Sequence, residues 1–369
     1  MMLPPQLGQF DDIVSAGVAQ AQGAKVALVF SETSDIYLND YSNAGAGKRS
    51  LYLALRHEQI AVDIVIEDDL EDSTINNYAA LFATCSHLRE AAGASLARWV
   101  HRGGSLFATA GAALLNETNG TNAALASLFG VTSHALLTPH TSTPAEIQYE
   151  KQDLPFATVI DHVTLSDNVL GASTADAMVA RPLVVYGDKA LYTFAATVPV
   201  DNVLGSFADG SPAVVRQTRG DGSATLAAFH PGLSYLATAI PRRPVARGAT
   251  DETFNHWVPS NFSTGVRALL AFAVDGIEGA RPVLSSEPLV DIGVIAASGK
   301  GTAVVAVNWG PTPVHALNLT LQFECDFSDA TLASGRKLAV SNTDQGWVSL
   351  VFDLGVADSV ILRPKQPQQ

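Results

Sequence analysis

Residues 78–117 constrain the fold more than any other part of the sequence, because they have the pattern of a strand, a helix and a second strand. The stretch 79–84 is short and almost wholly apolar, as expected of a strand that helices cover on both faces. A helical apolar pattern follows, with Ser86 as its expected cap and Gly103-Gly104 as its expected end. A second apolar run lies at 106–109. This order predicts a parallel crossover unit, and therefore an open α/β sheet.

Two earlier apolar runs, at 25–30 and 61–66, predict two further strands. Together with the crossover unit they give a flavodoxin-like order, in which the first and third strands lie side by side. A helix is expected at 48–59, and the glycine-containing stretch 43–50 is interpreted as a flexible loop. The loops after the first and third strands would flank the crevice in which open α/β sheets bind ligands.

Beyond Glu117 the pattern becomes mixed. Turn dipeptides at Asp209-Gly210 and Asp221-Gly222 separate alternating apolar strands, which predicts antiparallel pairing. A closing helix is expected at 262–274, and a run of short strands follows from 289 to 364. In the clearest of these strands, HALNLTLQF, the residues from His315 to Phe323 alternate between an apolar and a polar face.

These patterns predict three segments. Residues 1–23 form a lead-in helix, 24–280 an α/β domain with a mostly parallel sheet and flanking helices, and 285–369 a small antiparallel β-sandwich.

Composition narrows the choice of partners. The 369 residues carry a net charge of −14, which disfavours nucleic acid and anionic membrane surfaces as partners. Two distant cysteines, Cys85 and Cys325, provide neither a disulfide framework nor paired zinc spacing, so we expect no metal and no cofactor. The N-terminus lacks the basic start and apolar run of a secretory signal, and no stretch has the length of a membrane span. A cytoplasmic location is therefore expected.

The candidate catalytic residues lie in loops at the predicted strand ends. Cys85 stands at a strand-to-helix turn with His87 two residues later, although a buried packing role is the commoner fate of a free cysteine. Two facing carboxylates could serve as acid and base in glycoside hydrolysis. The catalytic candidates are Glu32, Asp35, Cys85, His87 and His230.

A non-catalytic ligand crevice is the alternative for the same loops. Basic and aromatic residues between 241 and 262 also resemble a carboxylate or carbohydrate clamp, or a domain interface. The ligand-binding candidates are Glu32, Asp35, His87, Glu117, His230, Arg243, Arg247 and His256.

Three stretches in order, KVALVFSETSD, AALFATCSHLREAAGASLARWVHRGGSLFATAGAALLNE and FADGSPAVVRQTRGDGSATLAAFHPGLSYL, resemble the trimerisation domain of glycoside hydrolase family 42 (GH42) β-galactosidases. The resemblance implies a class I glutamine-amidotransferase-like, flavodoxin-related fold over roughly residues 20–275. It also implies a small β-sandwich after it, and a homotrimer.

Two departures limit what the resemblance carries. The family's catalytic (β/α)₈ barrel, with its two essential glutamates, has no counterpart in these residues, because only some 24 residues precede the first predicted strand and a barrel needs about 250. The turn at which amidotransferases carry their nucleophilic cysteine reads Ala110-Gly111-Ala112 here. The resemblance thus implies a non-catalytic oligomerisation region that partners with copies of itself or with a glycosidase barrel, and that contributes to a carbohydrate site. The alternative is a stand-alone hydrolase related to glycoside hydrolases, or a sugar-binding protein.

Overall fold

A computed structural model describes the greater part of the chain. The described residues are 11–17, 24–38, 43–111, 113–138, 159–170, 182–239, 262–322, 327–343, 345 and 347–364. They divide into two compact units. The α/β unit comprises Lys25–Leu55 and Val62–Ile277, and the β unit comprises Glu278–Gln369 with Met1–Ala24 and Arg56–Ala61.

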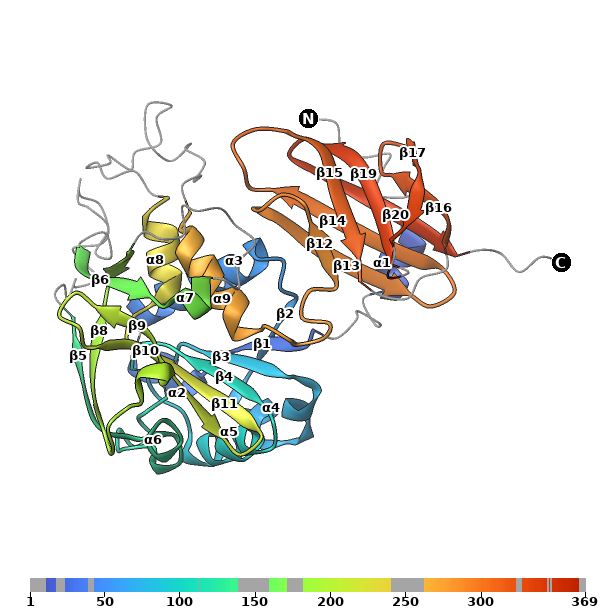
Figure 1. The fold of residues 1–369 in the computed structure, drawn as a ribbon. Coiled ribbons are helices and arrows are strands. Elements are labelled where there is room, and N and C mark those ends of the chain that lie inside the picture. Colours follow the sequence, from blue (N-terminus) through green and yellow to red (C-terminus); the bar gives the residue numbers. More distant parts are fainter. Residues whose placement is uncertain are drawn as a thin grey trace, which may run out of the picture. The chain divides into compact units, whose positions relative to one another are not determined.

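A nine-stranded sheet forms the centre of the α/β unit, in the order β2-β1-β3-β4-β11-β10-β9-β6-β7 (Figure 1). Neighbouring strands are parallel from β2 to β11 and antiparallel from β11 to β7. The predicted adjacency of the first and third strands is confirmed by the β1–β3 pairing. The strands are β1 (Val26–Val29), β2 (Val62–Val65), β3 (Ala80–Ala83), β4 (Ser105–Ala108), β6 (Val159–Leu165), β7 (Leu183–Tyr186), β9 (Val203–Phe207), β10 (Pro212–Arg219) and β11 (Gly222–Ala227).

Helices cover both faces of this sheet, with α5 and α6 on one face and α8 and α9 on the other (Figure 1). A separate two-stranded sheet pairs β5 (Val131–Leu137) with β8 (Lys189–Phe194). The helices of the unit are α2 (Glu32–Tyr37), α3 (Asn43–His57), α4 (Glu67–Glu71), η2 (Ser73–Asn77), α5 (Glu90–His101), α6 (Ala123–Phe129), α7 (Asp167–Leu170), η5 (Val200–Asn202), α8 (Pro231–Ala237) and α9 (Thr264–Ala273).

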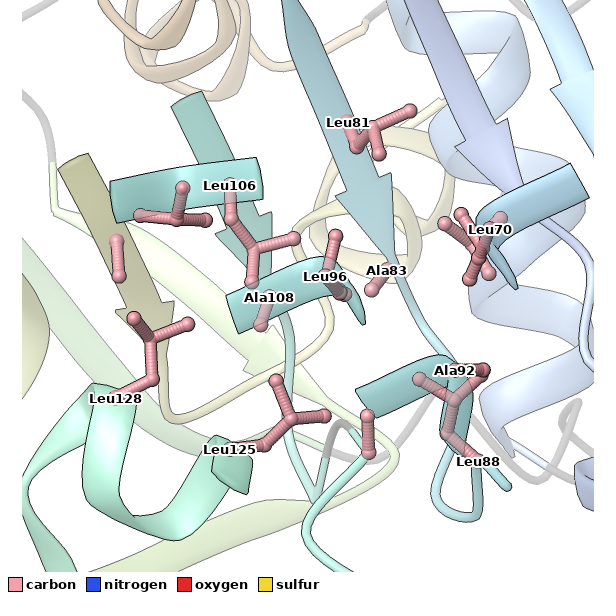
Figure 2. Close-up of a cluster of buried hydrophobic side chains, with 14 of the residues drawn as sticks. Leu70, Leu81, Ala83, Leu88, Ala92, Leu96, Leu106, Ala108, Leu125 and Leu128 are labelled. Carbon is pink, nitrogen blue, oxygen red and sulfur yellow. The ribbon is translucent and has the colours of Figure 1, made fainter. Parts of the chain in front are cut away.

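The core under α4, α5 and α6 comes from the alternating residues of the parallel strands. Leu81 and Ala83 of β3 and Leu106 of β4 belong to the same buried cluster as Leu96 of α5 (Figure 2). Helix α5 ends where predicted, because Gly103 adopts a positive φ of 114° that a side chain would disfavour. This packing confirms the strand–helix–strand unit read from residues 78–117.

Two local expectations were wrong. Ser86 does not cap α5, whose N-cap is Arg89, because the Ser86 side chain bonds to Ser34 and His87 instead. The stretch 43–50 is not a loop but the first two turns of α3. Gly47 allows the helix to approach His230 closely, since an added Cβ would lie 3.2 Å from the ring atom Nδ1. Tertiary packing thus overrides the low helix propensity of glycine.

The β unit contains two antiparallel sheets that share one buried core. The orders are β12-β15-β19-β18 and β13-β14-β20-β16-β17. Helix α1 (Asp11–Gly17) also belongs to this unit, and its Ile13 is buried beside β13, β14 and β20. The strands are β12 (Val283–Ser285), β13 (Val290–Ala297), β14 (Gly301–Asn308), β15 (Val314–Leu321), β16 (Phe327–Leu332), β17 (Lys337–Leu338), β18 (Val340–Asn342), β19 (Val348–Leu354) and β20 (Ala357–Pro364).

The alternation predicted for β15 holds from Leu317 to Leu321 but fails before it. Ala316 has a positive φ of 52°, and the pairing register with β19 shifts between Val314 and Leu317. This irregularity turns His315 away from the buried face, so its side chain is 86% exposed. Phe323 lies outside the described residues. Across the described ranges, every helix is too short or too polar to cross a membrane.

Candidate functional site

The parallel strands β1, β2 and β3 end at one edge of the sheet, where the candidate site was predicted. Ser31 directly follows Phe30 at the end of β1, Glu67 starts the helix after β2, and residues 84–89 follow β3. Side chains from these three loops therefore meet, although they lie far apart in sequence.

Glu67 is the centre of this edge, and sequence reasoning did not select it. Its carboxylate is almost fully buried and accepts hydrogen bonds from both neighbouring loops. Oε1 accepts from Ser31 Oγ at 2.6 Å and from the Thr33 amide at 3.0 Å. Oε2 accepts from Thr33 Oγ1 at 3.1 Å and from the amide and Nε of Arg89 at 2.9 and 3.1 Å. One carboxylate thus ties together the loops that follow β1, β2 and β3.

The protonation of Glu67 follows from these bonds. Burial alone would raise the pKa of its carboxyl group, but hydrogen bonds from Ser31, Arg89 and Thr33 outweigh burial and hold the pKa below its ordinary value. The Arg89 guanidinium also contacts Asp68 and Glu71. Glu67 is therefore an ionised anchor of the loops, with its oxygens occupied by protein donors.

Cys85 is buried behind this network. Burial, and secondly the negative charge of Glu67, raise the pKa of its thiol to about 12. A nucleophilic cysteine needs the opposite, a thiolate favoured by nearby positive charge. His87 does not supply a base for it, because both ring nitrogens have other partners.

His87 is held on three sides. Its Nδ1 lies 2.7 Å from Ser86 Oγ and its Nε2 lies 3.0 Å from Asn119 Oδ1. The ring of Tyr37 stacks on the imidazole with a centroid distance of 4.1 Å and an interplanar angle of 5°. The phenol O–H of Tyr37 in turn donates to the backbone carbonyl of Glu117. This arrangement locks the imidazole between two loops and a helix.

The three predicted carboxylates, Glu32, Asp35 and Glu117, have different surroundings. Glu32 is exposed in the first turn of α2, and Asp35 pairs with Lys48 at 3.3 Å. Glu117 uses Oε2 to accept from the amide of Glu90 at 2.8 Å, which satisfies a free N–H at the start of α5. Asp35 thus links α2 to α3, and Glu117 supports the start of α5.

His230 belongs to a different cluster, at the end of β11. Its Nε2 lies 3.0 Å from Asp188 Oδ2, and Asn43 donates to the other oxygen of Asp188 at 2.9 Å. Burial raises the pKa of Asp188, but the contacts with His230 and Asn43 outweigh it and leave the pKa below its ordinary value. Among described residues, Nδ1 of His230 has no hydrogen-bond partner, and it faces Gly47.

Three other predicted ligands, Arg243, Arg247 and His256, lie outside the described residues. In the described part of the chain, no three His, Cys, Asp or Glu side chains converge as a metal site requires.

The crevice between the ends of β1 and β3 is nearly filled. Ser31, Ser34 and Thr84 line it, and the first turns of α3 close it with Ala44 and Gly45. Its volume of about 10 Å³ has room for roughly one water molecule. A sugar ring does not fit there in this conformation.

Comparison with known proteins identifies solved structures that have a similar fold but longer chains. No protein-family model and no curated protein matches the sequence. A catalytic mutant of Gan42B, a GH42 β-galactosidase from G. stearothermophilus, aligns with 97% of this chain and 43% of its own, with a TM-score of 0.61 and 15% identity. The cold-adapted β-galactosidase from Rahnella sp. R3 aligns with 97% and 44%, with a TM-score of 0.58 and 17% identity.

An α-L-fucosidase, isoenzyme 2 from Paenibacillus thiaminolyticus, aligns with 97% of this chain and 51% of its own, with a TM-score of 0.58 and 13% identity. The chain therefore has a glycoside-hydrolase-related fold. It spans less than half the length of the two β-galactosidases.

Proposed function

We propose that this chain is a non-catalytic accessory region of the β-galactosidase type, which serves oligomerisation and borders a carbohydrate site in the assembled protein. Its α/β unit would correspond to the flavodoxin-like, amidotransferase-like trimerisation domain of GH42 enzymes, and its β unit to their C-terminal β-sandwich. The strand order β2-β1-β3-β4-β11 supports the first assignment, and two antiparallel sheets on one core support the second.

One observation carries the non-catalytic part of the proposal. At the ends of β1, β2 and β3, Glu67 and His87 are bound to other protein groups, and the crevice that Cys85 lines has room for about one water. Glu67 and His87 have protein partners on every charged or titrating atom, and the Cys85 thiol is buried. The turn after β4 offers Ala110 and Gly111 where an amidotransferase would carry its thiol.

The partner in this proposal is a second and third copy of the chain, or a glycosidase barrel. The β-galactosidases that share the fold are more than twice as long as this chain, which is consistent with a role beside a separate catalytic part.

The test combines activity with variants. The purified chain is incubated with a chromogenic galactoside and with a chromogenic amide, next to a boiled control, and Glu32→Gln and Cys85→Ser are assayed in parallel. We expect no turnover above the boiled control for any of the three proteins. Turnover that either substitution abolishes would overturn the proposal in favour of a stand-alone hydrolase.

A further inference from the structure

The turn at residues 116–120, between β4 and α6, contains the single Asn-Gly pair of the sequence, Asn119-Gly120. Asn119 is exposed and has a positive φ of 61°, a conformation that asparagine tolerates better than most residues. Gly120 carries no side chain that would screen its backbone nitrogen. The side-chain amide of Asn119 is therefore open both to solvent and to attack by the next backbone nitrogen.

The side chain of Asn119 is held against His87. Its Oδ1 lies 3.0 Å from Nε2 of the imidazole. An amide oxygen can only accept, so Nε2 of the neutral ring carries the proton and Nδ1 accepts from Ser86 Oγ at 2.7 Å. A donor at Oδ1 draws electron density from Cγ of Asn119 and stabilises the negative charge that develops on this oxygen when a nucleophile adds. His87 thus activates the Asn119 amide.

The amide nitrogen of Gly120 is restrained by Asn116. The Gly120 N–H donates to Oδ1 of Asn116 at 2.8 Å, and the amide and hydroxyl of Thr118 donate to the same oxygen at 3.1 and 2.9 Å. The Asn116 amide in turn donates to the Gly120 carbonyl at 2.7 Å. The Gly120 nitrogen can attack only when the turn opens locally, so these bonds slow the reaction without removing it.

We propose that Asn119 is a site of spontaneous deamidation and that Asn116 sets its rate. The Gly120 nitrogen forms a bond to Cγ of Asn119 and gives up its proton, the Cγ–Nδ2 bond breaks, and the side-chain nitrogen leaves with that proton as ammonia. The resulting succinimide takes up water and opens to aspartate or to isoaspartate. No oxidant or reductant takes part. This inference is independent of the proposed assembly role.

The modification changes the surroundings of His87. Isoaspartate adds a main-chain carbon before Gly120, inside the ring that the hydrogen bond between Asn116 and Gly120 closes. The longer main chain does not fit the same turn, so we expect the contact between residue 119 and Nε2 of His87 to be lost. The contacts of His87 with Ser86 and Tyr37 do not involve this turn and should remain.

The experiment incubates the full chain at mildly alkaline pH and follows the peptide that contains Asn119 by mass spectrometry. Labelling with an isoaspartate methyltransferase identifies the isoaspartate product. We expect loss of asparagine at position 119 and the appearance of both products. Asn77 is the control within the same sample, because it is also exposed but precedes Tyr78, and it should stay unmodified. An unmodified Asn119 in the folded chain, after a time in which the urea-unfolded chain is fully deamidated there, would overturn the proposal.

Two variants at one position test the role of Asn116. Asn116→Ala removes the acceptor for the Gly120 amide, and we expect deamidation at Asn119 to become several times faster than in the unchanged protein. Asn116→Asp keeps an acceptor oxygen for the Gly120 and Thr118 donors, so its rate should stay close to that of the unchanged protein. Equal rates in the alanine and aspartate variants would overturn the assignment of Asn116 as the residue that sets the rate.

Discussion

Replacing Glu67 by glutamine should destabilise the α/β unit far more than its small change in shape suggests. An amide keeps one acceptor oxygen and puts an NH₂ group in place of the other. In one orientation the NH₂ faces the amide and Nε of Arg89, and in the other it faces the Thr33 amide. These groups can only donate, so at least one buried backbone N–H loses its acceptor in either orientation.

The magnitude follows from these contacts. A hydrogen bond to a charged group contributes about 1.5–3 kcal/mol, and an unpaired buried donor costs about 1–3 kcal/mol. Removing one partner of a buried ion pair costs about 3–5 kcal/mol, and the partial exposure of the Arg89 side chain argues for the lower end. We therefore expect Glu67→Gln to lower the free energy of unfolding by about 3 kcal/mol.

Glu71→Gln is the matched control, because Glu71 also pairs with Arg89, at 3.2 Å, but at the surface. The Glu71→Gln substitution should lower the free energy of unfolding by less than about 1 kcal/mol. Because the chain has two units, unfolding in urea is best followed by hydrogen–deuterium exchange of peptides from β3 and α5. Equal losses for the two variants would refute the view that Glu67 anchors the three loops.

The contribution of Glu67 to the free energy of unfolding depends on pH in a definite direction. The pKa of Glu67 in the folded protein lies below its ordinary value of 4.5, so its contribution is complete above that value and is lost as the pH falls through the folded pKa. The difference in stability between the unchanged protein and Glu67→Gln should therefore be constant at neutral pH and shrink below pH 4.5. A difference that grows on acidification would contradict this assignment.

Three further changes test other parts of the account. In a Cys325→Ser background, Cys85 should resist iodoacetamide at neutral pH and react after unfolding in urea, since its pKa is raised to about 12; rapid labelling of the folded chain would argue against the buried thiol. Gly93→Ala should cost about 1–3 kcal/mol in thermal or urea unfolding although alanine favours helices, because the new methyl would overlap the buried Asn122 side chain, and a stabilised variant would refute that packing. Leu96→Ala should lower the free energy of unfolding by about 2–5 kcal/mol, with Ala94→Gly, at a less buried position of the same helix, limited to about 1 kcal/mol.

Sequence reasoning worked where the signal is local. The apolar runs of β1, β3 and β4 and the helical spacing in α5 predicted the parallel half of the sheet, because burial on both faces leaves a continuous apolar strand. The turn signals around Asp209 and Asp221 likewise predicted the antiparallel β9, β10 and β11.

Sequence reasoning failed where the local structure depends on residues that are distant in sequence. Glu67 stands in an acidic stretch of ordinary appearance, and its burial depends on donors from Ser31, Thr33 and Arg89. The only sequence signal for it was its position directly after a strand. The start of α3 was missed for a similar reason, because its Gly47 packs against His230, which lies far away in sequence.

The most direct test of the central claim is the mass of the purified chain in solution, measured by light scattering behind size exclusion over a range of micromolar concentrations. Self-assembly predicts a mass of at least twice 38.7 kDa, with three copies expected from the resemblance to the trimerisation domain. A mass of 38.7 kDa at every concentration would contradict self-assembly as the function of this chain.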